Sequence, residues 1–379
     1  MTEKKHKIAF LLLDEIHHLY HFISVAVWLS KKHEISILTY PDKHKLLYKT
    51  LEKLHGENVN VEQLKTLWFR AFTDKLKNRK LPRKGFWLKK NMNNLLENFD
   101  AIVFTDYYHR YVVEARKNQP FPKLIKLPHG PPGRAYSYNK DLLDFDLIFL
   151  TGKLHYKGLK KHDYLPKNYS ISGYPKIDIT HSKKTKYFFN NNLPVVLYNP
   201  HFDPKVTSWH TSGMRILDYF HNHKEYNLIF APHVNLFTSK GGEKKKSIPE
   251  KYFKAENIYI DLGSNKSINM SYTKTANIYL GDVSSQVYEF ILIKPRPCIF
   301  INSHQVIYEK DKNYRFWKCG EVLNSDEGLD QSLNNCFEKF KKYKSTQKKI
   351  IKKIFFIEKN STASQRYSNA IESFLNNVP

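Results

Sequence analysis

The sequence has few cysteines and no long apolar run. Its three cysteines, Cys298, Cys319 and Cys336, are far apart and odd in number, so they form no metal-ligand pattern. This usage is typical of a reducing compartment. The apolar run at residues 8–13 is too short for the core of a signal peptide, and no stretch approaches the length of a membrane span. We therefore expect a cytoplasmic protein.

Two further absences restrict the chemistry. The first predicted strand leads into LLLDEIHH, with no glycine-rich loop, which disfavours a nicotinamide enzyme. No carboxylate cluster indicates an obligatory metal, so we predict neither a metal site nor a cofactor. We also find no convincing carboxylate pair of the kind that sugar-nucleotide epimerases use near the anomeric centre.

Acidic residues are scarce beside basic ones. The chain has 36 Asp and Glu against 62 Lys and Arg, a net charge of +26. A charge of this size indicates anionic partners rather than a fold. Residues 75–90 hold eight basic residues close to Trp68, Phe72 and Trp87. A solvated helical hairpin and an anionic membrane surface explain this segment equally well. RNA ranks behind them, and we expect no nucleic-acid partner, because no RNA-binding motif accompanies the patch.

The elements that are present alternate between strand and helix. A predicted strand at residues 7–13, a helix at 16–29 and a strand at 34–40 are typical of the start of a doubly wound α/β domain. A second such run begins at residue 194, after a low-complexity segment at 181–192 that is typical of a linker.

The 379 residues are sufficient for two domains, and 41% hydrophobic residues can fill their cores. We predict an N-terminal Rossmann-like domain over residues 1–185, with a basic helical insertion at about 60–98. A C-terminal Rossmann-like domain over 186–379 would include the closing helices.

The segment 276–302 is the most informative local pattern. It predicts a strand, a Gly-Asp-Val-Ser-Ser turn, a helix over 286–293 and a second strand. The turn would lie at the carboxyl end of a strand and at a helix N-terminus, where a phosphate can bind. Asp282, Ser284 and Ser285 alone are better explained as a helix cap. They indicate a phosphate site only together with other polar clusters at strand ends.

Such clusters occur at four more predicted strand ends. They include His129 in a loop rich in Gly and Pro, Lys176 in GYPKID, His201 in YNPHFDP and His233 in APH. The carboxyl ends of strands face the ligand crevice in open α/β sheets, so these side chains could converge on one site. A neutral histidine can take the proton of an attacking hydroxyl, while Lys176 and His233 could neutralise phosphate charge.

Five motifs in order resemble the CDP-glycerol glycerophosphotransferases, the teichoic-acid polymerase and primase family of bacterial envelope synthesis. They are PHG at 128–130, GYPKID at 173–178, YNPHFDP at 198–204, APH at 231–233 and GDVSSQVYEFILIKPRPCIF at 281–300. The resemblance extends from about residue 100 to the C-terminus, and the first hundred residues correspond only in outline.

This resemblance implies a GT-B fold, with two Rossmann-like domains facing a cleft and the CDP-linked donor held mainly by the C-terminal half. It implies that His129 is the general base, that His233 is catalytic near the donor phosphates, and that Asp282, Ser284 and Ser285 bind the donor pyrophosphate. Further donor-binding candidates are Gly173, Lys176 and Pro232, and further donor or acceptor contacts are expected from Gly130, Asn199, His201, Asp203, Gln286 and Glu289.

Three departures from the family pattern leave the donor headgroup open between glycerol, ribitol and a sugar. Lys176 replaces the usual arginine and loses its bidentate geometry, the stretch after Asn199 has no arginine, and His233 is followed by Val234 rather than proline.

The expected function is therefore transfer of a polyol phosphate from a CDP-linked donor to a hydroxyl of a lipid-linked or polymer acceptor, in teichoic-acid or capsule synthesis. The enzyme would act peripherally on the inner face of the cell membrane, held by residues 75–90. One alternative is a GT-B glycosyltransferase that uses a nucleotide sugar. The other is a basic membrane- or RNA-binding protein without catalytic activity.

Overall fold

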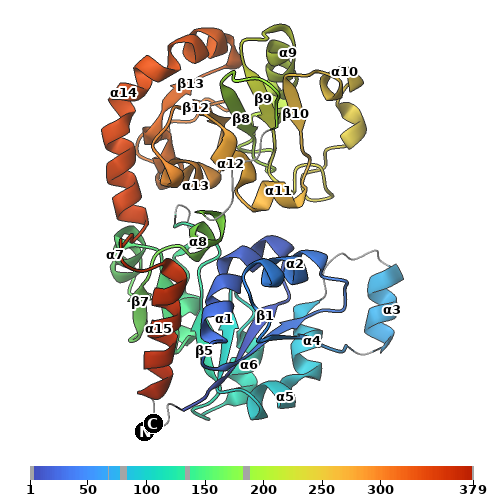
Figure 1. Ribbon diagram of the computed structural model, residues 1–379, viewed down its shortest axis with the longest axis vertical. Coiled ribbons are helices and arrows are strands. Elements are labelled where there is room, and N and C mark those ends of the chain that lie inside the picture. Colours follow the sequence, from blue (N-terminus) through green and yellow to red (C-terminus); the bar gives the residue numbers. More distant parts are fainter. Residues whose placement is uncertain (1–3, 67, 77–82, 133–136, 182–187, 378–379) are drawn as a thin grey trace. The chain divides into compact units, whose positions relative to one another are not determined.

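The computed structural model describes residues 4–66, 68–76, 83–132, 137–181 and 188–377. The chain divides into two compact units, a first unit of residues 1–182 and 353–379 and a second unit of residues 183–352. Each unit has its own parallel β-sheet with helices packed around it (Figure 1). The predicted two-domain α/β architecture is confirmed.

The first unit contains a seven-stranded sheet in the order β3-β2-β1-β4-β5-β6-β7, in which every pairing is parallel. β1 (KIAFLL) is buried along five of its six residues, as expected for a central parallel strand covered on both faces. The strand order reverses between β1 and β4, so the ligand crevice of this unit should lie at their carboxyl ends. The strands are β1 (Lys7–Leu12), β2 (Glu34–Thr39), β3 (Val59–Gln63), β4 (Ala101–Phe104), β5 (Lys123–Lys126), β6 (Leu147–Leu150) and β7 (Tyr169–Ile171).

The helices of the first unit differ from the prediction at two places. The predicted helix over 16–29 is a 3₁₀ helix followed by an α-helix, because Phe22 between them has a φ of −136°. The predicted helical insertion at 60–98 begins later, because Val59–Gln63 pairs with β2 as the edge strand β3. The helices are η1 (Ile16–His21), α1 (Ile23–Leu29), α2 (Lys45–Lys53), α3 (Trp68–Leu76), α4 (Lys84–Lys90), α5 (Met92–Glu97), α6 (Arg110–Arg116), η3 (Lys140–Asp144), α7 (Lys153–Lys161), α8 (Pro175–His181) and α15 (Ala363–Asn376).

The second unit repeats this design with a six-stranded parallel sheet in the order β10-β9-β8-β11-β12-β13. Its order reverses between β8 and β11. The strands are β8 (Val195–Asn199), β9 (Asn227–Phe230), β10 (Ile258–Ile260), β11 (Ile278–Gly281), β12 (Cys298–Ile301) and β13 (Glu321–Leu323). Its helices are the π-helical turn η4 (Trp209–Gly213), α9 (Met214–Asn222), η5 (Lys245–Ser247), α10 (Glu250–Phe253), α11 (Asn265–Ile268), α12 (Ser271–Thr275), α13 (Gln286–Ile293), η6 (Lys312–Cys319), η7 (Asp326–Gly328) and α14 (Leu329–Ile354).

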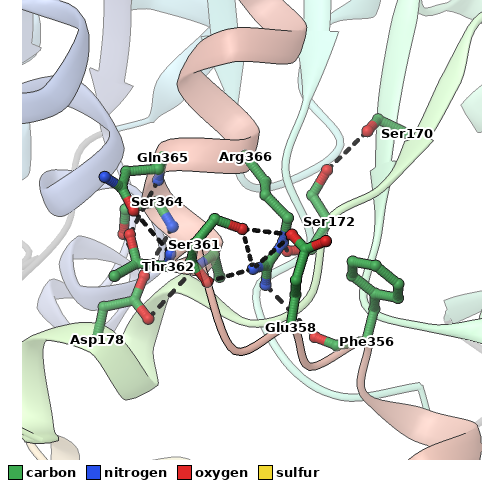
Figure 2. A network of polar contacts seen from close by, with 11 residues as sticks. Ser170, Ser172, Asp178, Phe356, Glu358, Ser361, Thr362, Ser364, Gln365 and Arg366 are labelled. Atoms are coloured by element: carbon green, nitrogen blue, oxygen red, sulfur yellow. Dashed lines mark hydrogen bonds and ion pairs between the residues drawn. The ribbon is translucent and has the colours of Figure 1, made fainter.

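Helix α15 belongs to the first unit, which corrects its predicted place in the C-terminal domain. Asp178 of α8 accepts hydrogen bonds from the backbone N–H and the hydroxyl of Ser364, at 2.7 and 2.6 Å (Figure 2). Arg366 donates through Nε to the Ser172 carbonyl at 3.1 Å. The ring of Tyr367 stacks on Phe149 with centroids 4.1 Å apart. These contacts join segments nearly 200 residues apart in the sequence, which local patterns cannot indicate.

Gly173 is required by the same arrangement. Its φ is +90°, and a β-carbon there would lie 2.4 Å from the Phe356 carbonyl oxygen. A side chain would therefore be strained by its backbone conformation and would also collide with the returning chain. The GYPKID motif thus holds the C-terminal segment through Gly173 and Asp178.

Candidate active site

In the first unit, polar residues gather after β1, β4 and β5, at the carboxyl edge of the sheet beside its point of reversal. His129 lies in the loop after β5. Its Nδ1 is 2.7 Å from the carbonyl oxygen of Thr105. A carbonyl oxygen only accepts, so the ring proton is on Nδ1 and the lone pair is on Nε2.

Burial, and the nearby charge of Lys126, lower the pKa of His129 to about 4. The imidazole is therefore neutral at pH 7. A neutral ring with its lone pair on Nε2 can accept a proton, which is the state that the predicted base requires.

Lys126 fixes the loop that positions His129. Its buried ammonium donates to the carbonyl oxygens of Thr105 and Leu127, both at 2.9 Å. Burial lowers the pKa of Lys126 to about 8. The carbonyl oxygen of Thr105 therefore accepts hydrogen bonds from both Lys126 and His129. We did not predict Lys126 as a site residue, although a lysine ending the apolar strand before the PHG motif was a usable signal.

Two more histidines, His18 and His21, lie in a row with His129. His18 stacks on the His129 ring with centroids 4.8 Å apart, and its Nδ1 is 3.0 Å from the hydroxyl of Thr105. His21 follows, with its ring centroid 6.4 Å from that of His18. The ring of His21 lies 5.6 Å from that of Tyr174, two residues before Lys176, and burial and the charge of Lys176 lower the pKa of His21. The histidines of the segment after β1 were visible in the sequence, but the prediction gave them no role.

Acidification is expected to destabilise the first unit. Burial lowers the pKa of His129 and His155 to about 4, and lowers those of His18 and His21 well below 6.5. Unfolded histidines titrate near 6.5, so between about pH 6.5 and 4 the unfolded chain binds more protons than the folded one. The free energy of unfolding that these neutral histidines contribute is fully present above pH 6.5 and is lost as the pH falls toward 4.

Burial raises the pKa values of Asp14 in the first unit and of Asp282 in the second to about 6, which opposes this trend, whereas the lowered pKa of His109 adds to it. Urea midpoints measured at pH 7.5 and pH 5 should therefore fall with pH. An unchanged or higher midpoint at pH 5 would contradict this assignment of neutral histidines.

In the second unit, Asp282 is fully buried directly after β11. One of its carboxylate oxygens accepts from the backbone N–H of His201 at 2.9 Å. The other accepts from the backbone N–H and the hydroxyl of Ser208, at 2.6 and 2.8 Å. These bonds hold the loop that follows β8. The geometry therefore gives Asp282 the role of positioning that loop, and its carboxylate is directed into the unit.

His201 and His233 lie together beside this loop, with ring centroids 5.3 Å apart. Nδ1 of His201 accepts from the backbone N–H of Asp203 at 3.0 Å, and Nδ1 of His233 accepts from that of Asn235 at 3.2 Å. In each neutral ring the proton is therefore on Nε2. Both histidines present an N–H donor, the tautomer opposite to that of His129, and such donors suit phosphate oxygens.

Other predicted contacts form the framework of this edge. Asn199 donates to the Ala231 carbonyl at 2.7 Å and accepts from the Tyr279 hydroxyl at 3.3 Å. The strands β8, β9 and β11 are thereby tied together at their carboxyl ends. Pro232 lies in the turn that leads from Ala231 to His233.

At the start of α13, the Ser284 hydroxyl accepts from the backbone N–H of Gln286 at 3.2 Å, whereas the N-cap residue Ser285 makes no side-chain cap hydrogen bond. Gln286 itself donates to the Ser267 carbonyl at 3.3 Å, and Glu289 is buried. Ser285 is partly exposed, and so is Asp203 in the loop after β8. Their proposed contacts with a donor stay predictions.

The structure thus brings the predicted residues together as two groups. Within the described ranges it shows no group of three or more His, Cys, Asp or Glu that could hold a metal ion. The first unit contains His129 and Gly130, with Lys176 beyond the histidine row. The second contains Asn199, His201, Asp203, His233, Asp282, Ser284 and Ser285.

Neither a family model nor a curated protein matches the sequence. Solved structures do resemble the fold. A variant of the wall teichoic acid polymerase TagF soaked with CDPG has a TM-score of 0.63 at 13% identity, over 99% of this chain and 90% of that one. UDP-GlcNAc 2-epimerase from Neisseria meningitidis, bound to UDP-GlcNAc, has a TM-score of 0.60 at 12% identity, over 99% of this chain and all of that one.

The calicheamicin glycosyltransferase CalG4 has a TM-score of 0.57 at 12% identity, over 98% of this chain and 99% of that one. At these identities the likeness concerns the fold, which these proteins share although their names describe different activities. The chain therefore has the GT-B fold, built from two Rossmann-like domains with seven- and six-stranded parallel sheets.

Proposed function

We propose that this protein is a transferase that moves a polyol phosphate from a CDP-linked donor to a hydroxyl of a lipid-linked or polymer acceptor in envelope polysaccharide synthesis. The observation that carries the proposal is the state of His129, a buried neutral imidazole whose Nδ1 donates to the Thr105 carbonyl at 2.7 Å, so that its lone pair is on Nε2. The fold likeness to TagF soaked with CDPG and the five sequence motifs support a cytidine donor.

In this mechanism the acceptor hydroxyl gives its proton to Nε2 of His129. Its oxygen forms a bond to the phosphorus that bears the polyol, and the bond from that phosphorus to the bridging oxygen of CMP breaks. CMP leaves with the electron pair of that bond. The second unit would hold the cytidine donor, and there Asp282 holds the loop that contains His201.

Nucleotide binding followed by CMP release tests the proposal. CDP, CMP, UDP, GDP, CDP-glycerol and CDP-ribitol are compared for their effect on thermal unfolding, since a ligand that binds only the folded state raises the midpoint. Selective stabilisation by cytidine nucleotides, with CMP released from a CDP-polyol when acceptor is added, is the expected result. Absence of CMP release from every CDP-alcohol would overturn the proposal.

A glycosyltransferase that uses a nucleotide sugar is the second candidate, and the fold shared with CalG4 favours it. Stabilisation by UDP or GDP alone, with that nucleotide released from a sugar donor, would select this candidate. In a purely binding protein, replacement of His129 and His233 would leave function intact.

Helix α3 supports a peripheral membrane location. Trp68, Phe72 and Leu76 follow one another at four-residue spacing and are 81%, 58% and 69% exposed. The helix lies at the margin of the first unit in Figure 1. Of the predicted basic segment 75–90, residues 77–82 lie outside the described residues, while Lys89 and Lys90 are exposed. No helix in the described part of the chain is long and apolar enough to cross a bilayer.

We expect the protein to bind vesicles that contain anionic lipid and to be released when salt is raised to about 1 M, where the screening length falls to about 3 Å. Trp68→Ala should weaken binding about tenfold, because the indole would leave the interface. Ile307→Ala, which removes a side chain 87% exposed in the second unit, is the matched control. Equal binding to neutral vesicles would contradict the role of the basic residues.

A further inference from the structure

A groove of about 660 Å³ opens on the first unit between α4 and α6. Its volume lies within the range of small-molecule sites, roughly 300–1,000 Å³. Four aromatic and four cationic side chains line it, together with two carboxylates. A ligand that combines a ring with an anionic group would fit this lining better than a purely apolar one.

Tyr111 of α6 forms an aromatic wall of the groove. Its ring rests on α4 at Gly85, where a β-carbon would lie 2.6 Å from Cζ of the tyrosine. The absence of a side chain at Gly85 therefore sets the position of the ring. The side chain is 36% exposed, so part of its surface is open to solvent. The apolar face of a sugar ring can pack on such a surface, while the hydroxyl of tyrosine remains polar.

Two cations lie beside this ring. Nζ of Lys89 is 5.6 Å from the centroid of Tyr111, and Lys89 is exposed. Arg110 has a side chain 65% exposed, and one of its guanidinium nitrogens donates to Asp141 at 2.6 Å. A guanidinium has five N–H donors, so Arg110 can bind a phosphate while it keeps this ion pair.

The groove adjoins the residue proposed as the base. Tyr107 lines the groove and also a small cavity formed with His129 and Gly130. Asp106, another lining residue, directly follows Thr105, whose carbonyl oxygen holds His129. Lys84 binds Asp14 and Asp106 between α4 and the carboxyl ends of β1 and β4. A ligand in the groove thus lies beside the loop that fixes the catalytic histidine.

We propose that this groove is the acceptor site and that it takes a phosphorylated saccharide, with the sugar ring on Tyr111, the phosphate on Lys89 and Arg110, and an attacking hydroxyl directed toward His129. This inference rests on the proposed transferase function and adds the chemical class of its acceptor. The proton and bond changes are those already given for the transfer step.

Binding measured without donor separates this inference from the proposed function. Glucose 1-phosphate is titrated into the wild-type protein and into Tyr111→Ala, Lys89→Ala and Arg110→Ala. Each variant is expected to raise Kd about fivefold or more. Lys90→Ala removes an exposed lysine of the same helix that does not line the groove, and should leave Kd within about twofold. Stabilisation by CDP should be the same in all of these variants.

Two competing probes test each half of the proposed ligand. Inorganic phosphate and methyl glucoside should both bind more weakly than glucose 1-phosphate. Equal binding of phosphate alone would overturn the saccharide assignment, and equal binding of methyl glucoside would overturn the phosphate assignment. A decyl phosphodiester of glucose that binds more tightly would identify a lipid-linked source, whereas equal affinity would identify a soluble one.

Gly85→Ala changes a lining residue of the groove without removing a side chain that contacts the proposed ligand. The three atoms nearest the added methyl group all belong to the end of the Tyr111 side chain, which can swing away, so the protein should fold. The displaced ring should weaken glucose 1-phosphate binding in the same direction as Tyr111→Ala. Wild-type affinity in a folded Gly85→Ala protein and in the three side-chain variants would overturn the proposal, even if CMP release confirmed the donor.

Discussion

His129→Asn should lower kcat/KM for CMP release by about 10²–10⁴-fold, the usual contribution of a general base. The asparagine amide can still donate to the Thr105 carbonyl, as Nδ1 of His129 does at 2.7 Å. It lacks the lone pair that Nε2 offers to the acceptor proton. Donor affinity should therefore stay within about twofold, because the loss occurs in the transition state.

His162→Asn, at an exposed position after α7, is the matched control and should retain full activity. The acid limb of the kcat/KM profile provides a second readout. Because burial lowers the pKa of His129 to about 4, that limb should lie well below pH 6.5. An active His129→Asn protein with an unchanged profile would exclude His129 as the base.

Asp282→Ala should destabilise the second unit by about 3–5 kcal/mol. The carboxylate accepts from the backbone N–H groups of His201, Ser208 and Val283 in the unit interior. Each buried donor left without a partner costs about 1–3 kcal/mol. For a unit of this size the melting temperature should fall by roughly 10 °C. The released loop would also displace His201 and weaken CDP binding.

Asp203→Ala is the matched control for stability, since the carboxylate of this partly exposed aspartate accepts a local bond from the backbone N–H of Lys205 at 3.0 Å. Its melting temperature should change by no more than a few degrees. Asp282→Asn keeps one acceptor oxygen and should fall between the two variants. If Asp282→Ala melted like wild type yet no longer bound CDP, the carboxylate would be a ligand contact rather than a loop support.

Local patterns predicted those parts of the fold that depend on neighbouring residues. The strand, turn and helix around Asp282 follow from apolar periodicity and from the polar residues between them, and α13 begins and ends where that periodicity does. Strand-end positions also predicted that His129 lies at the carboxyl edge of one sheet, and His201 and His233 at that of the other, because a parallel sheet places its strand ends on one edge.

Features that depend on long-range contacts escaped prediction. The position of α15 depends on Asp178 and Ser364, which are 186 residues apart. The neutral state of His129 depends on burial and on Lys126, and its tautomer on the carbonyl of Thr105, neither of which a motif encodes. Asp282 was predicted to contact phosphate, but a sequence cannot show that a carboxylate faces inward.

The return of the chain to the first unit has a consequence for folding during synthesis. Residues 183–352 form an uninterrupted unit, whereas the first unit needs residues 353–379 as well as 1–182. A ribosome delivers the second unit complete before α15 emerges, and domains generally fold as units. The second unit can therefore finish folding first, before α15 is available to cover the surface around Gly173 and Phe149. Until then, that apolar surface stays exposed on the nascent chain and can be bound by a chaperone.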